Sequence, residues 1–439
     1  MSPLRLSLCR VTVVSAAALA AAAGCTRIVD AVTLQDCAQQ PNAAGCEPSP
    51  WPRTGHGRNS DPWLVSHRTV ITEMRPRVLV LNFQNGVTVD GARQVAERQV
   101  AAVAEGSRYH AYADPAAPPF IRYEIVKVVN LTDTTPPSGW PYPSSTRLPT
   151  TPTGEFDVLA LFSSRFVADY GFPDPNMPTR ALSLCELYEL GSINEVWILD
   201  GEAGLRRAPL SLERKQNYDG TETAVPGSFA PNAGGRDRLE DIICGVTVRL
   251  AHLDGARGPG CDLEVRGWEI EAMWEALPSL RADALAFLNR DFDTRFGVRF
   301  GGWNDLPCDQ ASTTPCINYP TPTRAEGSYP DGTRWSIDPF LQGCGSTEFP
   351  PNARFRGDIP MNNTMVQSRC EHFGLRDGPG GNDTYELYSA AKVAALEQAF
   401  PDCGGGWQIY WRQSIPGLGN HAVNADGTPM KNWWPLLFY

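Results

Sequence analysis

Two glutamates and a tryptophan recur at helical spacing in the segment CDLEVRGWEIEAMWEAL, which runs from Cys261 to Leu277. In a helix, Glu264, Trp268 and Glu271 lie along one stripe, because residues three and four positions apart are neighbours. A glycoside hydrolase needs an acid, a carboxylate that activates water or attacks, and an aromatic face for the sugar. The glutamates are separated by about 10 Å of helix rise, which favours an inverting pair. We therefore expect Glu264 and Glu271 to be acid and base and Trp268 to bind the sugar.

The same segment also fits an ordinary amphipathic helix. Its glutamates would then be a solvated flank, opposite an apolar face formed by Leu263, Ile270, Trp274 and Leu277. Gly267 weakens the helical prediction, because glycine costs a helix interior about 1 kcal/mol relative to alanine. Arg266 is a further candidate for contact with a polar ligand.

A second acidic pair, Asp200 and Glu202, follows an apolar run over residues 194–199 that is expected to be a strand. Ligands of α/β proteins settle beyond the carboxyl ends of strands, so both residues are candidate binding residues. By the same rule, that site could also be lined by Asn82, Gln84 and Asn85. A polar turn after a buried strand is the alternative.

Two histidines have surroundings that bear on chemistry. His252 continues the alternation of Val246, Val248 and Leu250, which predicts a core position, with a catalytic or metal role as the alternative. His372 lies two residues after Cys370, whose disulfide could hold it as a general base, and it is our third catalytic candidate. No two histidines stand at metal-binding spacing, so we predict no metal and no cofactor.

The elements that position these residues alternate in the first half of the chain. Apolar runs predict strands over residues 77–83, 121–129, 156–162, 194–199 and 243–252, and apolar periodicity predicts a helix over 90–105. A Pro-, Thr- and Ser-rich stretch over 132–154 is expected to be a surface loop. Alternating strands and helices indicate an α/β fold with a parallel or mixed sheet and flanking helices, over residues 63–255.

The second half, residues 256–439, is rich in loops, aromatic residues and cysteines. Periodicity predicts helices over 263–277, 280–289 and 384–400 and a strand over 407–412, while 301–361 is expected to be largely irregular. The terminal stretch NWWPLLFY is so apolar that it must be buried. We expect this disulfide-stapled half to pack on the sheet.

The first 25 residues have the features of a lipoprotein signal peptide: an Arg-bearing start, a short apolar run, and small residues before Cys25. Lipidation of Cys25 would anchor the chain, and residues 26–62 would form a flexible tether. Ala22 stands where leucine is usual, which leaves ordinary cleavage near Ala23 as the alternative. We therefore expect a protein of the cell envelope, at the outer membrane or cell surface.

Cysteine usage agrees with export. Twelve cysteines become ten when Cys9 leaves with the signal peptide and Cys25 carries the lipid, and ten can all pair. Cys37 with Cys46 and Cys308 with Cys316 are close enough to close small loops, and the other six must pair over distance. No pair has the two-residue spacing of structural zinc sites, so we predict disulfides.

A stretch from Cys344 to Ala353 (CGSTEFPPNA), with Asn432-Trp433-Trp434, resembles a loose group of uncharacterised exported bacterial proteins. The resemblance covers the second half and brings no established activity. Some of those proteins carry histidines at the positions of Glu264 and Trp268 and a glutamate at Glu271, which implies a metal site in them. Because this chain has Glu264 and Trp268 instead of histidines, the resemblance argues against metal catalysis here. It equally suggests that this chain has lost an activity that those proteins have.

Charge excludes two classes of partner. The formal net charge is −11 and no Lys/Arg run occurs, so neither nucleic acid nor an anionic membrane face is an expected partner. The membrane is contacted through the lipid anchor alone, and the expected ligand is a polar small molecule or a glycan. We predict a hydrolase of glycans or similar polar polymers. The alternatives are a surface binding protein without turnover, and a metal-dependent hydrolase that uses His252, His372, Glu264 and Glu271.

Overall fold

The computed structural model describes residues 36–131, 157–163, 166, 172–174, 176–200, 211–212, 215–218, 224–229, 244–288, 317–328, 333–340, 343–355, 358–359 and 363–439. All of them belong to one unit, Gln35–Tyr439. Cys25, Glu202, the Cys308–Cys316 pair and the whole of the expected loop over 132–154 lie outside these residues. Within the described residues, no helix is long and apolar enough to cross a membrane.

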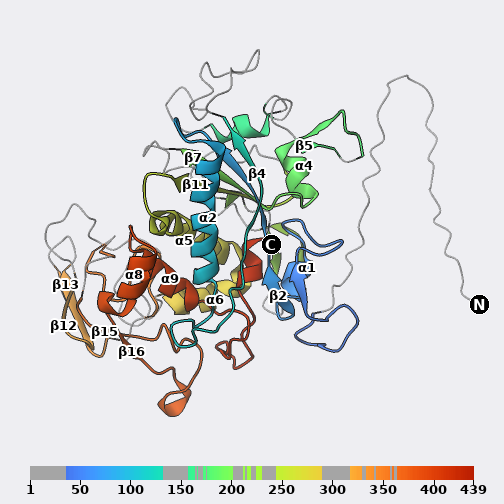
Figure 1. Ribbon diagram of the computed structural model, residues 1–439. Helices are drawn as coiled ribbons and strands as arrows, with labels where there is room; N and C mark the ends of the chain where they lie inside the picture. Colours follow the sequence, from blue (N-terminus) through green and yellow to red (C-terminus); the bar gives the residue numbers. More distant parts are fainter. Residues whose placement is uncertain are drawn as a thin grey trace, which may run out of the picture. The chain divides into compact units, whose positions relative to one another are not determined.

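A mixed sheet forms the centre of the described residues (Figure 1). Its strands, in spatial order, are β4 (Glu124–Asn130), β3 (Arg77–Asn82), β7 (Glu195–Asp200), β11 (Val248–Asp254) and β8 (Ser211–Leu212). The first four are parallel, and β8 is antiparallel at the edge. Continuous apolar runs such as RVLVLN and EVWILD form its central strands, because a parallel sheet is buried on both faces. The predicted α/β fold is confirmed.

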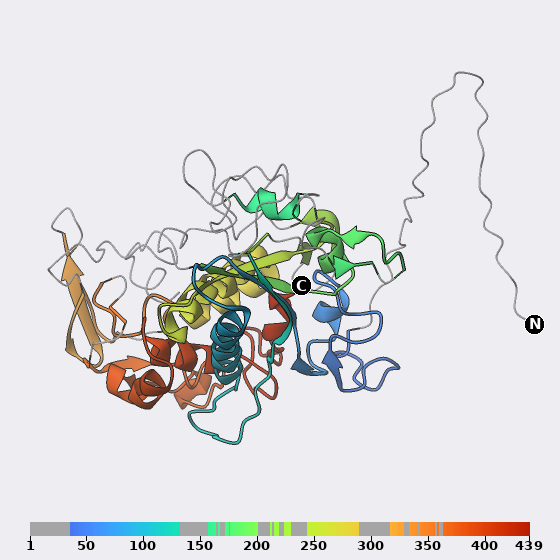
Figure 2. The same ribbon diagram turned by 45° about the horizontal axis from the view of Figure 1, so that its top comes forward.

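Successive residues of each strand enter two different cores, because side chains alternate between the faces of a sheet. On one face, Trp197 and Leu199 pack with α2 (Val89–Gly106) and α5 (Pro259–Ala276). Figure 2 shows these two helices beside each other on that face. On the other face, Val196 and Ile198 pack with α4 (Leu184–Glu189).

Two helices of this frame have side-chain caps. The Thr88 hydroxyl accepts from the Gly91 amide at 3.1 Å at the start of α2. At the start of α4, Ser183 and Glu186 form a reciprocal capping box. Each cap satisfies an amide that a helix start leaves without an internal partner, and so fixes where the helix begins.

The strand predicted over 407–412 is wrong, because this segment is the helix α9 (Gly405–Gln413). Trp407, Tyr410 and Trp411 have the i, i+3, i+4 spacing of a helix, but the apolar run is short and every residue of α9 is buried, so the run reads equally well as a strand. The consecutive glycines 404–406 at the start of α9 let its backbone approach neighbouring segments closely. A Cβ on Gly405 would lie 1.8 Å from the Phe400 carbonyl oxygen, and one on Gly260 of α5 would lie 2.0 Å from that of Asp402.

Two other predictions are corrected. Residues Val158–Phe162 form the 3-10 helix η1 instead of a strand, and the Asp157 side chain caps it by accepting from the Ala160 amide at 3.3 Å. The helix predicted over 384–400 divides into β16 (Glu386–Tyr388), the 3-10 helix η5 (Ala390–Val393) and α8 (Ala394–Ala399). Its first part is a strand because it pairs with β15 (Val366–Ser368), so a tertiary partner overrides local propensity.

The stretch expected to be irregular contains a small antiparallel sheet of β12 (Ile317–Thr321), β13 (Arg324–Ser328) and β14 (Arg334–Ile337). The remaining elements of the described residues are α6 (Pro278–Leu288), α1 (Trp63–Ser66), β1 (Ser49–Trp51), β2 (Ile71–Met74), β5 (Phe172–Pro173), β6 (Ala181–Leu182), β9 (Gln216–Tyr218), β10 (Ala224–Phe229), η4 (Pro379–Gly381) and η6 (Trp434–Leu437). Residues 36–62, expected to be part of a tether, pack on the body: β1 pairs with β2, and Trp51 is fully buried.

Four disulfides occur among the described residues. Cys37–Cys46 closes the small loop predicted from the sequence. The six cysteines expected to pair over distance form Cys185–Cys244, Cys261–Cys403 and Cys344–Cys370. These bonds indicate an oxidising, extracytoplasmic environment. They also constrain the unfolded chain and so stabilise the fold.

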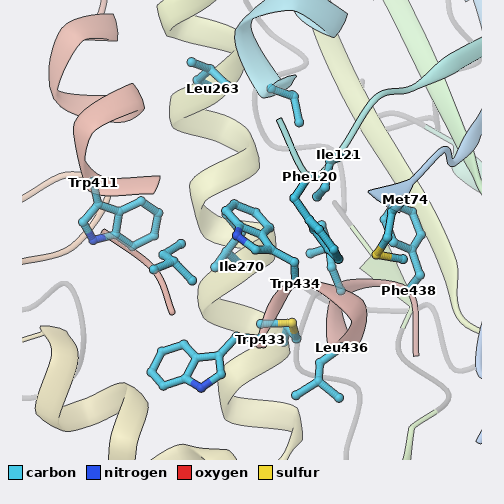
Figure 3. Packing of buried hydrophobic residues seen from close by; sticks show 14 of the residues in the cluster. Met74, Phe120, Ile121, Leu263, Ile270, Trp411, Trp433, Trp434, Leu436 and Phe438 are labelled. Carbon is cyan, nitrogen blue, oxygen red and sulfur yellow. The ribbon is translucent and has the colours of Figure 1, made fainter. Parts of the chain in front are cut away.

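The apolar terminal stretch is buried, as predicted. Trp433, Trp434, Leu436 and Phe438 enter the core, where Trp434 lies beside Ile270 of α5 (Figure 3). The indole of Trp433 makes edge contacts with Trp274 and Phe287, at centroid distances of 5.5 and 5.9 Å. Burial of this stretch therefore joins the end of the chain to α5 and α6.

Candidate functional site

Buried polar side chains converge at the carboxyl edge of the sheet, where β7 and β11 end. Asp200 is the last residue of β7 and pairs in register with Asp254, the last residue of β11. His252 lies two residues before Asp254, so it shares a face of the sheet with Asp200. The Nε2 atom of His252 is 2.9 Å from Oδ1 of Asp200, and both side chains are less than 8% exposed. His252 is therefore buried, as predicted, and it lies next to the carboxyl group of Asp200.

A third member, Asp262, comes from the first turn of α5, which starts five residues after β11 ends. Its Oδ1 atom accepts a hydrogen bond from the Asp254 amide at 2.8 Å, which ties the helix start to the strand end. Burial raises the pKa of the Asp262 carboxyl to about 7, although that amide and the nearby His252 act in the opposite direction. Near neutral pH this carboxyl is therefore able to donate a proton.

The polar residues after β3 have two different roles. Asn82 closes its own turn, because its amide nitrogen donates to Asn130 Oδ1 at 2.9 Å and to the Val87 carbonyl at 2.8 Å. Gln84 lies against Gly255 after β11: a Cβ there would be 2.3 Å from Gln84 Oε1. That oxygen is buried without a hydrogen-bond partner among the described residues. Gln84 therefore reaches the edge at which Asp200 and Asp262 lie.

Strand order makes this edge the expected place for a ligand. The chain runs from β3 to β4 on one side, whereas β7 and β11 follow on the other side of β3. Connections that leave in opposite directions from neighbouring parallel strands open a crevice at the carboxyl ends. Two carboxyls and an imidazole gathered there, one carboxyl with a strongly raised pKa, have the composition of an acid–base site.

The glutamates expected to be acid and base lie elsewhere, on α5. The helix itself is as predicted, but Glu271 is buried and its Oε1 accepts from the Thr347 amide at 2.9 Å. The Thr347 hydroxyl donates to the Glu264 carbonyl at 3.2 Å, and a Cβ on Gly267 would lie 1.9 Å from that hydroxyl oxygen. Gly267 is thus explained by the close approach of Thr347. Trp268 on the same stripe is partly buried.

Arg266, expected to contact a ligand, is buried between α5 and the sheet. Its Nη1 atom is 2.7 Å from Oε1 of Glu195, and its guanidinium stacks 4.5 Å from the Trp197 ring and 5.4 Å from the Tyr123 ring. Glu269 of α5 pairs in turn with a buried arginine of β11, Arg249, at 2.6 Å. Arg266 therefore holds α5 on the sheet.

His372 belongs to a second polar cluster, next to Cys370 in the turn after β15. Its Nδ1 is 2.6 Å from Asp377 Oδ2, and one ring nitrogen lies within 4.8 Å of a carboxylate oxygen of Glu371 and one of Glu386. Burial and the charge of Glu371 raise the pKa of Glu386 to about 7. Among the described residues, neither His252 nor Glu264 nor Glu271 lies close enough to His372 to bind the same metal ion. The fold does not assemble the metal-ligand set that the sequence suggested.

Comparisons with known proteins give no match: no protein-family model, no curated protein and no solved structure resembles this chain. The protein is therefore classified by its fold alone, as an α/β protein with a mixed sheet and disulfides. Sequence reasoning named Asp200 but missed Asp262. The available signal was its position, an acidic residue in the first turn of the helix that follows a predicted strand.

Proposed function

We propose that this chain is an exported, lipid-anchored hydrolase of glycans or similar polar polymers, with Asp262 as proton donor and the Asp200–His252 pair as base. The proposal is supported by the Asp200–His252 pair at the ends of β7 and β11 and by Asp262 in the first turn of the helix that follows β11, where its carboxyl is near enough to His252 for the two to interact electrostatically. Hydrolysis of a glycosidic bond needs one group that protonates the leaving oxygen and one that activates water. The proposed reaction is the one expected from the sequence, but its acid and base are Asp262 and Asp200 instead of Glu264 and Glu271.

The environments of these groups support distinct roles. Asp262 is enclosed at the start of α5, and burial raises its pKa to about 7, so that it can give up a proton near neutral pH. Asp200 lies 2.9 Å from the imidazole of His252, which holds and orients that carboxyl. Two carboxyls whose surroundings differ in this way can serve as acid and as base in one reaction.

Asp262→Asn should lower the turnover of a cleaved glycan by about 10²- to 10⁴-fold, because asparagine cannot supply the proton. Release of reducing ends from a panel of soluble polysaccharides and aryl glycosides measures this effect. Wild-type turnover should also fall above pH about 7, as Asp262 ionises. The matched control is Asp90→Asn, which changes an exposed aspartate in the first turn of α2.

Three outcomes separate the classes of function. Loss of turnover in Asp262→Asn and His252→Gln, with Asp90→Asn unchanged, supports the hydrolase. Binding of a glycan without cleavage by the wild type replaces it with a surface binding protein. Equal activity in Asp262→Asn and the wild type removes Asp262 from the reaction.

The anchor is proposed from the sequence around Cys25 and from the disulfides of the body. Cys25→Ser should move the protein from the membrane pellet to the supernatant of cells broken without detergent, because the acceptor of the lipid is removed. Immunoblots of the two fractions measure this. A variant that stays in the pellet would refute lipid anchoring at Cys25.

A further inference from the structure

A cluster of ionisable side chains remains outside the carboxyl edge, in the region of β15, β16 and α9. Glu371 and His372 are neighbours in the turn after β15, and Glu386 opens β16. One oxygen of each glutamate and one ring nitrogen of the histidine lie within 4.8 Å of one another. We propose that Glu371, His372 and Glu386 bind a divalent transition-metal ion of the zinc type. The site is independent of the proposed hydrolase chemistry.

The fold holds the three ligands in place before any ion binds. In the β15–β16 pair, Ser368 is in register with Glu386, which brings the turn after β15 against the start of β16. The Glu371 amide donates to Glu386 Oε1 at 3.4 Å. The disulfide Cys344–Cys370 fixes the residue directly before Glu371. Ligands fixed in this way lose little conformational entropy on binding.

The imidazole has a carboxylate partner of the kind that metal-binding histidines use. Its Nδ1 faces Asp377 at 2.6 Å, so Nε2 is the nitrogen that would bind the proposed ion. Asp377 is itself held by Thr384, whose amide donates to its Oδ1 at 2.9 Å. A carboxylate on the far nitrogen fixes the tautomer of a metal-binding histidine and makes its ligating nitrogen more basic.

Ligand chemistry selects the kind of ion. Two carboxylates and an imidazole suit zinc and its first-row neighbours, whereas magnesium and calcium prefer oxygen ligands alone. Glu386 offers a free acceptor, because its Oε2 atom is buried with no hydrogen-bond partner among the described residues. His372 and Glu371 keep side-chain exposures of 30% and 20%, so an ion can reach them from solvent.

One positive charge already lies beside the cluster. The Lys392 ammonium is 2.7 Å from Glu371 Oε1, and the Tyr410 hydroxyl donates to the same oxygen at 3.1 Å. A bound metal ion would compete with Lys392 for Glu371, because two cations on one carboxylate repel each other. Lys392 therefore lowers the affinity of the site for a metal ion but does not occupy it.

Isothermal titration of Zn²⁺ into chelator-treated full-length protein should give one site per chain with a Kd in the micromolar range or tighter. His372→Ala and Glu386→Gln should each weaken Zn²⁺ binding by at least about 100-fold, and Asp377→Asn by about 10- to 100-fold. Lys392→Met should strengthen binding, since it removes the competing charge. The control is His421→Ala, which removes an exposed histidine outside the cluster and should change nothing.

Cobalt(II) gives a second readout, because a mixed nitrogen–oxygen site produces visible absorption bands that free cobalt lacks. Circular dichroism of the metal-free variants shows that each is folded. Absence of saturable binding, or binding that His372→Ala and Glu386→Gln leave unchanged, would overturn the proposal. Binding of Ca²⁺ as tight as that of Zn²⁺ would refute the role of His372. None of these readouts depends on hydrolysis, so a failed metal site and a failed hydrolase are distinguishable.

Discussion

Glu195→Ala should lower the free energy of unfolding by about 3–5 kcal/mol. Glu195 is fully buried on β7, where it pairs with Arg266 at 2.7 Å and accepts from the Tyr123 hydroxyl. Without this carboxylate, the guanidinium of Arg266 stays buried between α5 and the sheet with its nearest counter-charge removed. An uncompensated buried charge costs far more than the lost contact itself. Urea unfolding of the purified protein, followed by far-UV circular dichroism, measures the change.

Two further variants test this reason. Glu73→Ala removes a carboxylate that pairs with Arg75 at 2.8 Å and Arg122 at 3.2 Å, both of which are more than half exposed, and should cost less than about 1 kcal/mol. Replacing Glu195 and Arg266 together by methionine should recover much of the loss, because no charge is then left unpaired. Equal losses in Glu195→Ala and Glu73→Ala would show that the buried pair does not hold α5.

The contribution of Asp262 to the free energy of unfolding should fall by up to about 4 kcal/mol as the pH rises from about 4 to about 7. The pKa of Asp262 is about 7 in the folded protein, against 3.8 in the absence of burial. Between these values the folded protein keeps the proton and the unfolded chain has released it. The stabilisation is therefore complete below pH about 4 and is lost by pH about 7.

Asp262→Asn should flatten this dependence, because asparagine imitates the protonated acid and can still accept from the Asp254 amide. Urea unfolding at half-unit pH steps from 4.5 to 8 compares the two proteins, with Asp90→Asn as the exposed control. Part of the slope should remain in every variant, since the pKa of Glu386 is also raised to about 7. Identical slopes in wild type and Asp262→Asn would contradict a buried, protonated Asp262.

The local hydrophobic pattern was enough to predict the strands that are buried on both faces and the helix that is buried on one face. The runs RVLVLN and EVWILD are continuous because parallel strands are covered on both faces, and they became β3 and β7. The periodic helix α2 also has the expected place, because one of its faces meets the core. For the same reason the apolar end of the chain had to be buried, whatever its neighbours.

Pattern failed where a tertiary partner decided the outcome. The segment that forms α9 is short and buried all round, so its apolar run was read as a strand although Trp407, Tyr410 and Trp411 have helical spacing. The role of its glycines becomes clear only from the tertiary structure, in which α5 packs within contact distance of them. In the stretch predicted as one helix over 384–400, pairing with β15 turns the first part into β16.

The amino-acid sequence by itself determined the α/β class, the use of cysteine in disulfides and the place of Asp200 at the end of a buried strand, because each follows from local composition and spacing. Only the tertiary structure decided which groups meet: it joins Asp200 to His252 and Asp262 to the amide of Asp254, and it places Arg266 and Glu271 in contact with protein groups. The physical reason is distance along the chain. Hydrophobic pattern acts over a few residues, whereas Asp200 and His252 meet only through the pairing of β7 with β11.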